Sequence, residues 1–235
     1  MNSALRQEYL AALGVSTWTV RGNTPAAAAV APASEESASV SRPAGEPREA
    51  GVDWPALRAR VAACTRCSLS TTRTQTVFGV GNLQAEWLIV GEAPGAEEDR
   101  SGEPFVGRAG QLLNSMLRAI GLAREQVYIA NVLKCRPPGN RDPVFSETVE
   151  CLPYLEQQIA LLKPKIMLAV GRIAAQNLLR TEKTLGSLRQ QVHRFGISQV
   201  PLIVTYHPGY LLRTPTDKRK TWEDLKFARE VCARV

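Results

Sequence analysis

A short apolar run that ends in a glycine-rich loop constrains the fold of this chain more than any other feature. Residues 86–90 contain Trp87-Leu88-Ile89-Val90, with no polar face, as expected for a parallel strand buried on both sides. Gly91-Glu92-Ala93-Pro94-Gly95 ends this run, and a polar segment follows it. Open α/β sheets bind ligands at the carboxyl ends of their strands, although such a loop also occurs as a plain structural crossover.

Apolar and amphipathic segments alternate along the rest of the chain. Further buried strands are expected at 126–132, 165–171 and 200–206. Amphipathic patterns predict helices between the strands and after the last one, at 109–121, 145–162, 172–180 and 219–233. A first helix is expected from Asp53, a plausible N-cap, toward Ala63. Strands that alternate with helices predict right-handed βαβ units and a parallel sheet with helices on both faces.

The N-terminal residues have a different composition from the rest. Residues 1–21 predict a short amphipathic peptide, with a helix at 4–13, of the kind that docks onto a protein partner. Its Leu-x-x-Leu-Gly-x-x-x-Trp pattern resembles the N-terminal peptide of the bacterial clamp-loader psi subunit, so residues 4–21 suggest a replisome partner. Residues 22–51, rich in Ala, Pro and Ser, predict a disordered linker before a folded domain at 52–235.

Charge and hydropathy limit the location and the partners. The N-terminus lacks the basic start and apolar core of a secretory signal, and no apolar run reaches the roughly 20 residues of a membrane span. We therefore expect a cytoplasmic monomer that does not contact a membrane. The chain has a net charge of +7, although residues 1–52 carry five acidic and four basic side chains. A basic folded part suits a polyanion such as nucleic acid, and it also occurs in generally basic soluble proteins.

Four of the five cysteines form two pairs. Cys64 and Cys67 make a C-x-x-C pair at the end of the first expected helix, and Cys135 and Cys151 follow the second expected strand. In a cytosolic chain these side chains point to a metal site or reactive thiols rather than to disulfides. Four thiolates suit zinc or an iron–sulfur cluster, and the wide spacing of the second pair favours a cluster.

Six motifs in order link the chain to a known family. They are C-x-x-C at 64–67, GEAPGAEED at 91–99, GEPFVGRAGQLL at 102–113, NVLKCRPPGNRDP at 131–143, Cys151, and YHPGYLLR at 206–213. Together they resemble the family 4 uracil-DNA glycosylases, the iron–sulfur branch of that superfamily, over residues 53–235. The resemblance implies an α/β/α three-layer sandwich around a four-stranded parallel central sheet. It also implies a structural [4Fe-4S] cluster on Cys64, Cys67, Cys135 and Cys151.

The resemblance implies base excision repair of uracil in single- or double-stranded DNA. The enzyme flips the nucleotide out and hydrolyses the bond between uracil and deoxyribose. Substrate-binding positions would be Gly91, Phe105 and Asn131, with the Phe105 ring stacking on the base. The Asn131 amide can donate to uracil O4 and accept from N3, a pattern that cytosine reverses. His207 would donate toward O2 as negative charge develops on the base.

The sequence offers two carboxylates that could activate water. Family 1 relatives carry an Asp in the equivalent loop, where this chain has Ala93. Glu92 or Glu98 could orient the water, or the reaction could depend on charge stabilisation alone. Gly95 stands where family 1 has an aromatic ring that excludes thymine, and Glu98 could fill that space. The acidic residues at 97–99 also fit a solvated loop.

Apolar and basic side chains after His207 suggest the DNA contacts. Leu211 and Leu212 would form an exposed wedge that enters the base stack. The phosphate contacts expected beside it come from basic residues on both sides of the wedge, namely Arg213, Lys218, Arg219, Lys220, Lys134, Arg136 and Arg141. Residues 217–220 also fit a solvated helix start.

A different class of function also fits part of the sequence. Ala93 and the N-terminal peptide suit a non-catalytic DNA-binding or replisome-adaptor module that kept the fold. Asn131, Phe105 and His207 favour the enzyme, because a module that only binds DNA needs none of them. A DNA-crosslinking relative uses a histidine-bearing insertion after the second strand, and residues 134–141 contain no histidine.

Overall fold

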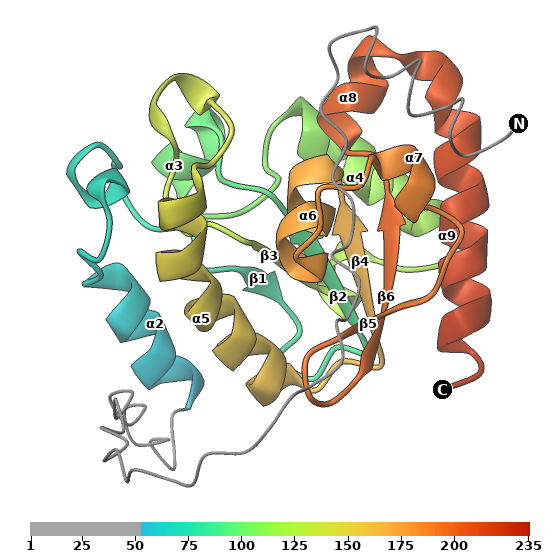
Figure 1. The fold of residues 1–235 in the computed structure, drawn as a ribbon, viewed down its shortest axis with the longest axis horizontal. Coiled ribbons are helices and arrows are strands. Elements are labelled where there is room, and N and C mark those ends of the chain that lie inside the picture. Colours follow the sequence, from blue (N-terminus) through green and yellow to red (C-terminus); the bar gives the residue numbers. More distant parts are fainter. Residues whose placement is uncertain (1–52) are drawn as a thin grey trace, which may run out of the picture. The chain divides into compact units, whose positions relative to one another are not determined.

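A six-stranded mixed sheet forms the centre of residues 53–235, the part of the chain that the computed structural model describes (Figure 1). The predicted N-terminal peptide at 1–21 and the predicted linker at 22–51 lie outside the described residues. The strands are β1 (Val80–Gly81), β2 (Trp87–Gly91), β3 (Tyr128–Asn131), β4 (Ile166–Val170), β5 (His193–Phe195) and β6 (Val200–Thr205). Their spatial order is β1-β3-β2-β4-β6-β5.

The directions of the strands correct the sequence-based expectation. The pairs β3–β2, β2–β4 and β4–β6 are parallel, whereas β1 and β5 run antiparallel to their neighbours at the two edges. The sheet therefore has six strands and is mixed, where a four-stranded parallel central sheet was expected: the four expected strands lie in the middle, and the two antiparallel edge strands were not expected. The missed strands contain only two and three residues, too few to show an alternating pattern. Short edge strands of this kind limit pairing with other chains.

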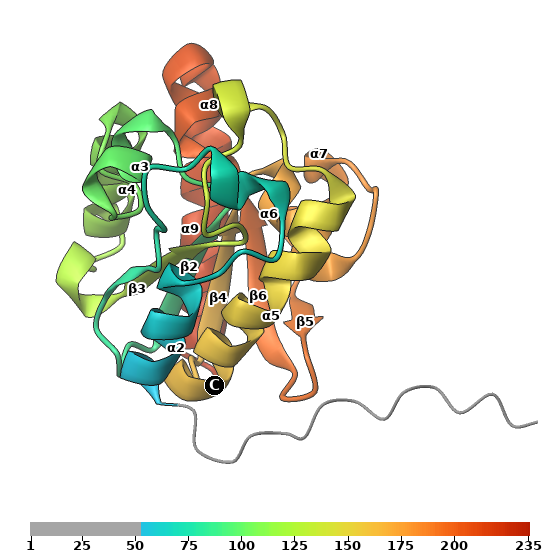
Figure 2. The ribbon, with the colours of Figure 1, turned by 90° about the vertical axis from the view of Figure 1, so that its left-hand side faces the viewer.

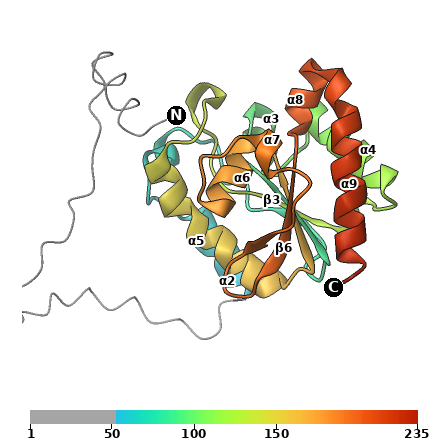
Figure 3. The same cartoon turned by 45° about the vertical axis from the view of Figure 1, so that its right-hand side comes forward.

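Helices cover both faces of this sheet (Figures 2 and 3). The helices described are α2 (Trp54–Ala62), α3 (Ala96–Ser101), α4 (Arg108–Ala119), α5 (Phe145–Leu162), α6 (Arg172–Leu179), α7 (Leu185–Leu188), α8 (Pro208–Arg213) and α9 (Lys218–Cys232). Apolar side chains of α4, α8 and α9 pack on one face, around Trp87 and Ile89 of β2. Those of α5, α6 and α7 pack on the other face, around Leu88 and Val90. Successive residues of β2 thus serve opposite layers.

A third apolar cluster lies beside the second face and involves the cysteines. It joins Leu57 and Val61 of α2 to Leu133, which follows β3, and to Cys135 and Cys151. The first helix is thus packed against the region that the cysteine pairs occupy. None of the helices described at 53–235 is long and apolar enough to cross a membrane.

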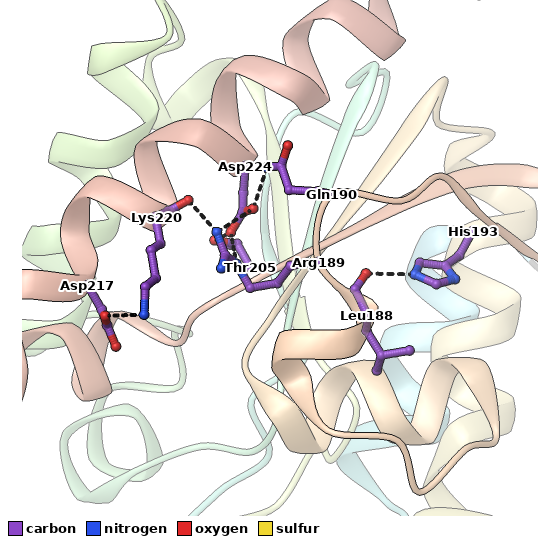
Figure 4. Close-up of polar contacts among 8 residues, drawn as sticks. All are labelled: Leu188, Arg189, Gln190, His193, Thr205, Asp217, Lys220 and Asp224. Carbon is purple, nitrogen blue, oxygen red and sulfur yellow. Dashed lines mark hydrogen bonds and ion pairs between the residues drawn. The ribbon is translucent and has the colours of Figure 1, made fainter.

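A buried ionic network attaches the end of β6 to helix α9 (Figure 4). Arg189, in the loop after α7, donates to both carboxylate oxygens of Asp224, at 2.7 and 2.9 Å, and to the Lys220 carbonyl at 2.7 Å. Asp224 is 0% exposed and also accepts hydrogen bonds from Thr205 at 2.8 Å and Gln190 at 2.7 Å. The two oxygens of this carboxylate therefore accept four hydrogen bonds. One of the donors, Thr205, is the last residue of β6.

We predict that Arg189→Met lowers the free energy of unfolding by about 3–5 kcal/mol, because it leaves the buried Asp224 carboxylate without its ionic partner. Urea-induced unfolding measures the change. Arg219→Met is the matched control, since it breaks an exposed i,i+4 pair with Glu223 and should leave stability nearly unchanged. Equal stability of the two variants would contradict the prediction.

Candidate functional site

Three strands deliver chemically distinct residues to one edge of the sheet. Gly91 ends β2 and pairs in register with Asn131, which ends β3. His207 follows β6 and is the N-cap of α8. The arrows of β4 and β6 point toward the end of the molecule where α8 lies (Figure 1). Parallel strands thus bring the sequence-predicted residues Gly91, Asn131 and His207 to the same edge.

The Asn131 side chain is buried and incompletely bonded. It is 2% exposed, and its Oδ1 has no hydrogen-bond partner among the described residues. A Cβ on Gly91 would collide with this Oδ1 and would lie 2.7 Å from the Phe105 ring. Only glycine at position 91 therefore lets the amide and the ring approach each other. A buried, unbonded acceptor costs about 1–3 kcal/mol, so this oxygen is suited to a ligand that donates a hydrogen bond.

Phe105 is held in an uncommon backbone conformation. Its φ is 55°, and the ring is 6% exposed and packs in the cluster beneath α4. The turn is fixed by Arg124, whose guanidinium donates to the carbonyls of Pro104 at 2.6 Å and Phe105 at 3.3 Å. The ring centroid lies 5.6 Å from that of His207, at an interplanar angle of 33°. Phe105 thus belongs both to the core and to the candidate site.

His207 carries a fixed and neutral imidazole. The Gly209 N–H donates to its Nδ1 at 3.0 Å, so the neutral ring carries its proton on Nε2. Burial, assisted by the positive charge of Arg213, lowers the pKa of His207 to about 4, although Glu98 acts in the opposite direction. At neutral pH this side chain is therefore a hydrogen-bond donor through Nε2–H and not a cation.

Glu92 and Glu98 differ in their surroundings. Burial raises the pKa of Glu92 to about 7, with a further contribution from Asp142 that Arg172 partly opposes. Glu98 accepts hydrogen bonds from three backbone N–H groups, those of Gly95 at 3.1 Å, Val106 at 3.1 Å and Gly107 at 3.4 Å. The oxygens of Glu98 thus hold the backbone of the loop, which favours a structural role for this residue. Glu92 remains as the candidate base.

All four paired cysteines line one pocket, together with Arg73 and Lys134 among others. Cys64 and Cys67 are partly buried, and Cys135 and Cys151 are buried. Arg73 donates to Cys135 Sγ at 3.1 Å, and the Lys134 backbone N–H donates to Cys151 Sγ at 3.2 Å. Within residues 53–235, no group of three or more His, Cys, Asp or Glu side chains is arranged to hold a metal ion.

The structure corrects part of the expected DNA-contact set. Leu211 is 1% exposed and packs in the core, so it is not an exposed wedge residue, whereas Leu212 is 37% exposed. Arg213, Lys218 and Arg219 are exposed near the start of α9. In the six-residue helix α8, Leu211 and Leu212 point in directions about 100° apart, and the sequence alone did not indicate which one faces inward.

The basic residues expected on the other side of the wedge are buried or already bonded to neighbouring side chains. Lys134 is 1% exposed and cannot reach a phosphate from that position. Arg141 donates to both carboxylate oxygens of Glu147, one of them at 2.9 Å, and Arg136 donates to Asn140 at 2.8 Å. The buried contacts of Lys134 could not be inferred, because its sequence neighbours look like a basic loop.

Comparison with known proteins agrees with this arrangement. The profile of the uracil DNA glycosylase superfamily matches residues 78–226. A Type-4 uracil-DNA glycosylase of Archaeoglobus fulgidus is 45% identical over 181 residues, which cover 74% of this chain and 90% of the relative. The Type-4 enzyme of Pyrobaculum aerophilum is 43% identical over 180 residues, covering 74% and 92%. The chain belongs to the Type-4 uracil-DNA glycosylases.

A third relative carries the same family name. The Type-4 enzyme of Sulfurisphaera tokodaii is 40% identical over 184 residues, which cover 74% of this chain and 83% of the relative. The family expected from the six sequence motifs is therefore confirmed, and the match includes the strand ends that carry Gly91, Asn131 and His207.

We predict that Glu98→Ala speeds amide hydrogen exchange at Gly95, Val106 and Gly107, because these N–H groups lose a partly buried acceptor. A loss of about 1–3 kcal/mol corresponds to exchange roughly ten- to a hundredfold faster. Exchange measured by NMR gives the rate for each amide. Glu103→Gln, an exposed carboxylate in the same loop, should leave all three rates unchanged. Unchanged rates in Glu98→Ala would show that the carboxylate does not hold the loop.

Proposed function

We propose that this protein removes uracil from DNA by hydrolysing its N-glycosidic bond, which leaves an abasic site. The observation that carries the proposal is the buried Asn131 amide, whose Oδ1 has no partner among the described residues. It lies at the strand ends beside Phe105, in a chain of the Type-4 family. Single- and double-stranded DNA are both proposed substrates, with the nucleotide flipped out of the stack.

The Asn131 amide supplies a basis for recognising uracil. Its Oδ1 can accept the N3–H of uracil, and its amide N–H₂ can donate to O4. Cytosine has an unprotonated N3 and an amino group at C4, so both contacts would be lost. A site built for such contacts can discriminate by a factor of about 10⁴. The Phe105 ring lies close to Gly91, and the hydrogen bonds of Arg124 to the Pro104 and Phe105 carbonyls hold it there. The ring provides a surface on which the base stacks.

His207 is the proposed group that stabilises the departing base. As the glycosidic bond breaks, negative charge develops on uracil and positive charge on the sugar. A neutral imidazole with its proton on Nε2 can donate a hydrogen bond to O2, and the Gly209 contact keeps this tautomer in place. Preorganised donors of this type contribute a few kcal/mol to the stabilisation of a transition state.

Glu92 is the proposed base for the attacking water. It directly follows Gly91 at the end of β2, and its raised pKa leaves a carboxylate basic enough to accept a proton near neutral pH. Glu98 contributes indirectly, because its three backbone contacts fix the loop that carries Phe105. We therefore assign Glu98 a positioning part rather than a catalytic one.

DNA is proposed to bind across the edge of the sheet where α8 begins. Leu212 is exposed on α8 and suits a wedge that enters the base stack. Arg213, Lys218 and Arg219 are available for phosphates nearby, which would make binding depend on salt and not on sequence.

A [4Fe-4S] cluster on Cys64, Cys67, Cys135 and Cys151 is part of the proposal. The four side chains line one pocket, and Arg73 and the backbone N–H of Lys134 donate to two of their sulfurs. Four cysteines around one pocket match the number of thiolate ligands that such a cluster would need. When bound, it would link the segment after α2, the segment after β3 and helix α5 as a structural crosslink.

Incubation with an oligonucleotide that contains one uracil tests the proposed activity, with release of uracil and strand cleavage at abasic sites as the readouts. We predict that Asn131→Asp lowers kcat/KM for uracil by about 10⁴-fold, because a carboxylate has no donor for O4. The same variant should gain activity on cytosine, whose amino group can donate to the carboxylate.

The matched control for that variant is Asn82→Asp, because Asn82 Oδ1 accepts the Gln84 N–H at 2.8 Å and aspartate preserves this bond. The control should act on uracil as the unmodified protein does. DNA binding without release of uracil by the unmodified protein would overturn the enzyme and favour the non-catalytic module. Unchanged uracil activity in Asn131→Asp, with no gain on cytosine, would remove Asn131 from base recognition.

We predict that kcat rises with pH through about 7 and then levels off. The pKa of Glu92 is about 7, so the carboxyl group is protonated and inactive as a base below this pH and ionised above it. Glu92→Gln should lower the plateau by about 10²–10⁴-fold and abolish the rise. Glu97→Gln, an exposed carboxylate on α3, should keep both. A pH profile that keeps its rise in Glu92→Gln would argue for charge stabilisation without this base.

A further inference from the structure

Lys134 carries a positive charge in a place where charge is costly. The side chain is 1% exposed, and its Nζ donates to the Asn131 carbonyl at 2.8 Å and to Gln158 Oε1 at 2.6 Å. Both acceptors are neutral, and no ion pair to a carboxylate is formed by Lys134 within residues 53–235. A buried ammonium without an opposite charge costs several kcal/mol, so a methionine of similar size would fill this position at lower cost.

The groups that can balance this charge are sulfurs. The backbone N–H of Lys134 donates to Cys151 Sγ at 3.2 Å, the next residue is Cys135, and Lys134 lines the pocket that contains all four paired cysteines. Cysteines that bind a metal do so as thiolates, which carry negative charge. On the other side of the pocket Arg73 donates to Cys135 Sγ at 3.1 Å. Arg73 and the backbone N–H of Lys134 thus donate to two sulfurs of one pocket, and Lys134 is among the residues that line it.

The other end of the Lys134 contacts lies in the candidate base site. The ammonium group binds the backbone carbonyl of Asn131, the residue whose side chain has the unbonded Oδ1. Gln158 of α5 continues this series of buried hydrogen bonds. Its Nε2 donates to the Phe78 carbonyl at 2.9 Å and to the Tyr128 hydroxyl of β3 at 3.2 Å. The ammonium thus bridges the end of β3 and helix α5, the helix that carries Cys151.

We propose that Lys134 is a positioning residue that connects uracil recognition to the four-cysteine site: its ammonium holds the Asn131 peptide in place, and the thiolate charge of that site balances the ammonium. The inference rests on the proposed function for the identity of the base and of the cluster. The sequence suggested that Lys134 binds a phosphate, whereas its side chain is buried and its ammonium binds the Asn131 carbonyl. It also gives a physical reason for a lysine at this position.

Two measurable properties follow from this arrangement. Loss of the ammonium releases the Asn131 carbonyl, so the side-chain amide is less well oriented and free uracil binds more weakly. A hydrogen bond to a charged group contributes about 1.5–3 kcal/mol, which corresponds to a roughly ten- to hundredfold higher dissociation constant. Loss of the positive charge also makes reduction of a cluster on the four sulfurs less favourable, because reduction adds negative charge. The reduction potential should therefore become more negative.

The experiment compares Lys134→Met with the unmodified protein, both purified anaerobically with their iron and matched by visible absorbance. Free uracil binding is measured by calorimetry, binding of uracil-free DNA by fluorescence anisotropy, and the reduction potential by voltammetry. We expect weaker uracil binding, unchanged DNA binding and a more negative potential. Tyr128→Phe is the matched control, because it removes the buried hydrogen bond between Gln158 and the Tyr128 hydroxyl without changing the charge. It should keep the potential.

A second variant keeps the inference testable if Lys134→Met fails to fold or to retain iron. Lys134→Arg preserves the charge but changes the reach of the donor, so we expect a potential close to that of the unmodified protein together with weaker uracil binding. A potential in Lys134→Met equal to that in Tyr128→Phe would overturn the charge balance. Unchanged uracil binding in both Lys134 variants would overturn the positioning part. Failure of the unmodified protein to bind or release uracil would count against the proposed function instead, and the potentials would still test the link to the cysteines.

Discussion

The register between β2 and β3 is the constraint on which the site depends. It sets Gly91 opposite Asn131, and the pairing continues beyond the strands through the Val132 N–H to the Gly91 carbonyl at 2.9 Å and the Leu133 N–H to the Glu92 carbonyl at 3.0 Å. A shift of one residue would turn the Asn131 side chain to the opposite face of the sheet. The missing Cβ of Gly91 then provides the space in which the amide and the Phe105 ring meet. The absence of a side chain at one residue thus determines whether Asn131 and Phe105 can meet in the candidate site.

Much of the fold could be predicted because the central strands and the long helices have strong patterns. The expected helix at 145–162 coincides with α5, the strand expected at 86–90 is shifted by one residue from β2, and the strand expected at 200–206 is one residue longer than β6. The edge strands and the short helices α3 and α8 were missed, because two to six residues give too little periodicity. In these segments long-range packing, and not the local sequence, determines the structure.

For the candidate site, the sequence suggested residues but not the contacts that those residues make. Motifs identified Asn131, Phe105 and His207, and the strand ends explain why Asn131 and His207 lie at one edge. The sequence did not distinguish Glu98, whose oxygens hold backbone N–H groups, from Glu92, whose burial raises its pKa to about 7. It also placed Lys134 on the surface, because charge in a loop of basic residues usually indicates exposure. Burial and hydrogen-bond partners depend on tertiary packing, which residue types alone do not specify.

The shortness of α8 has a mechanical consequence. The helix has six residues and begins directly at the His207 cap, so no flexible segment separates the imidazole from Leu212. Leu211, buried on the inner side, fixes the rotation of this unit about its axis. Any force that a bound duplex exerts on the outer leucine would therefore be transmitted to the imidazole as a rigid-body displacement. In the proposed complex, the exposed leucine that meets the stacked bases and the imidazole that donates to the departing base would belong to one short rigid unit.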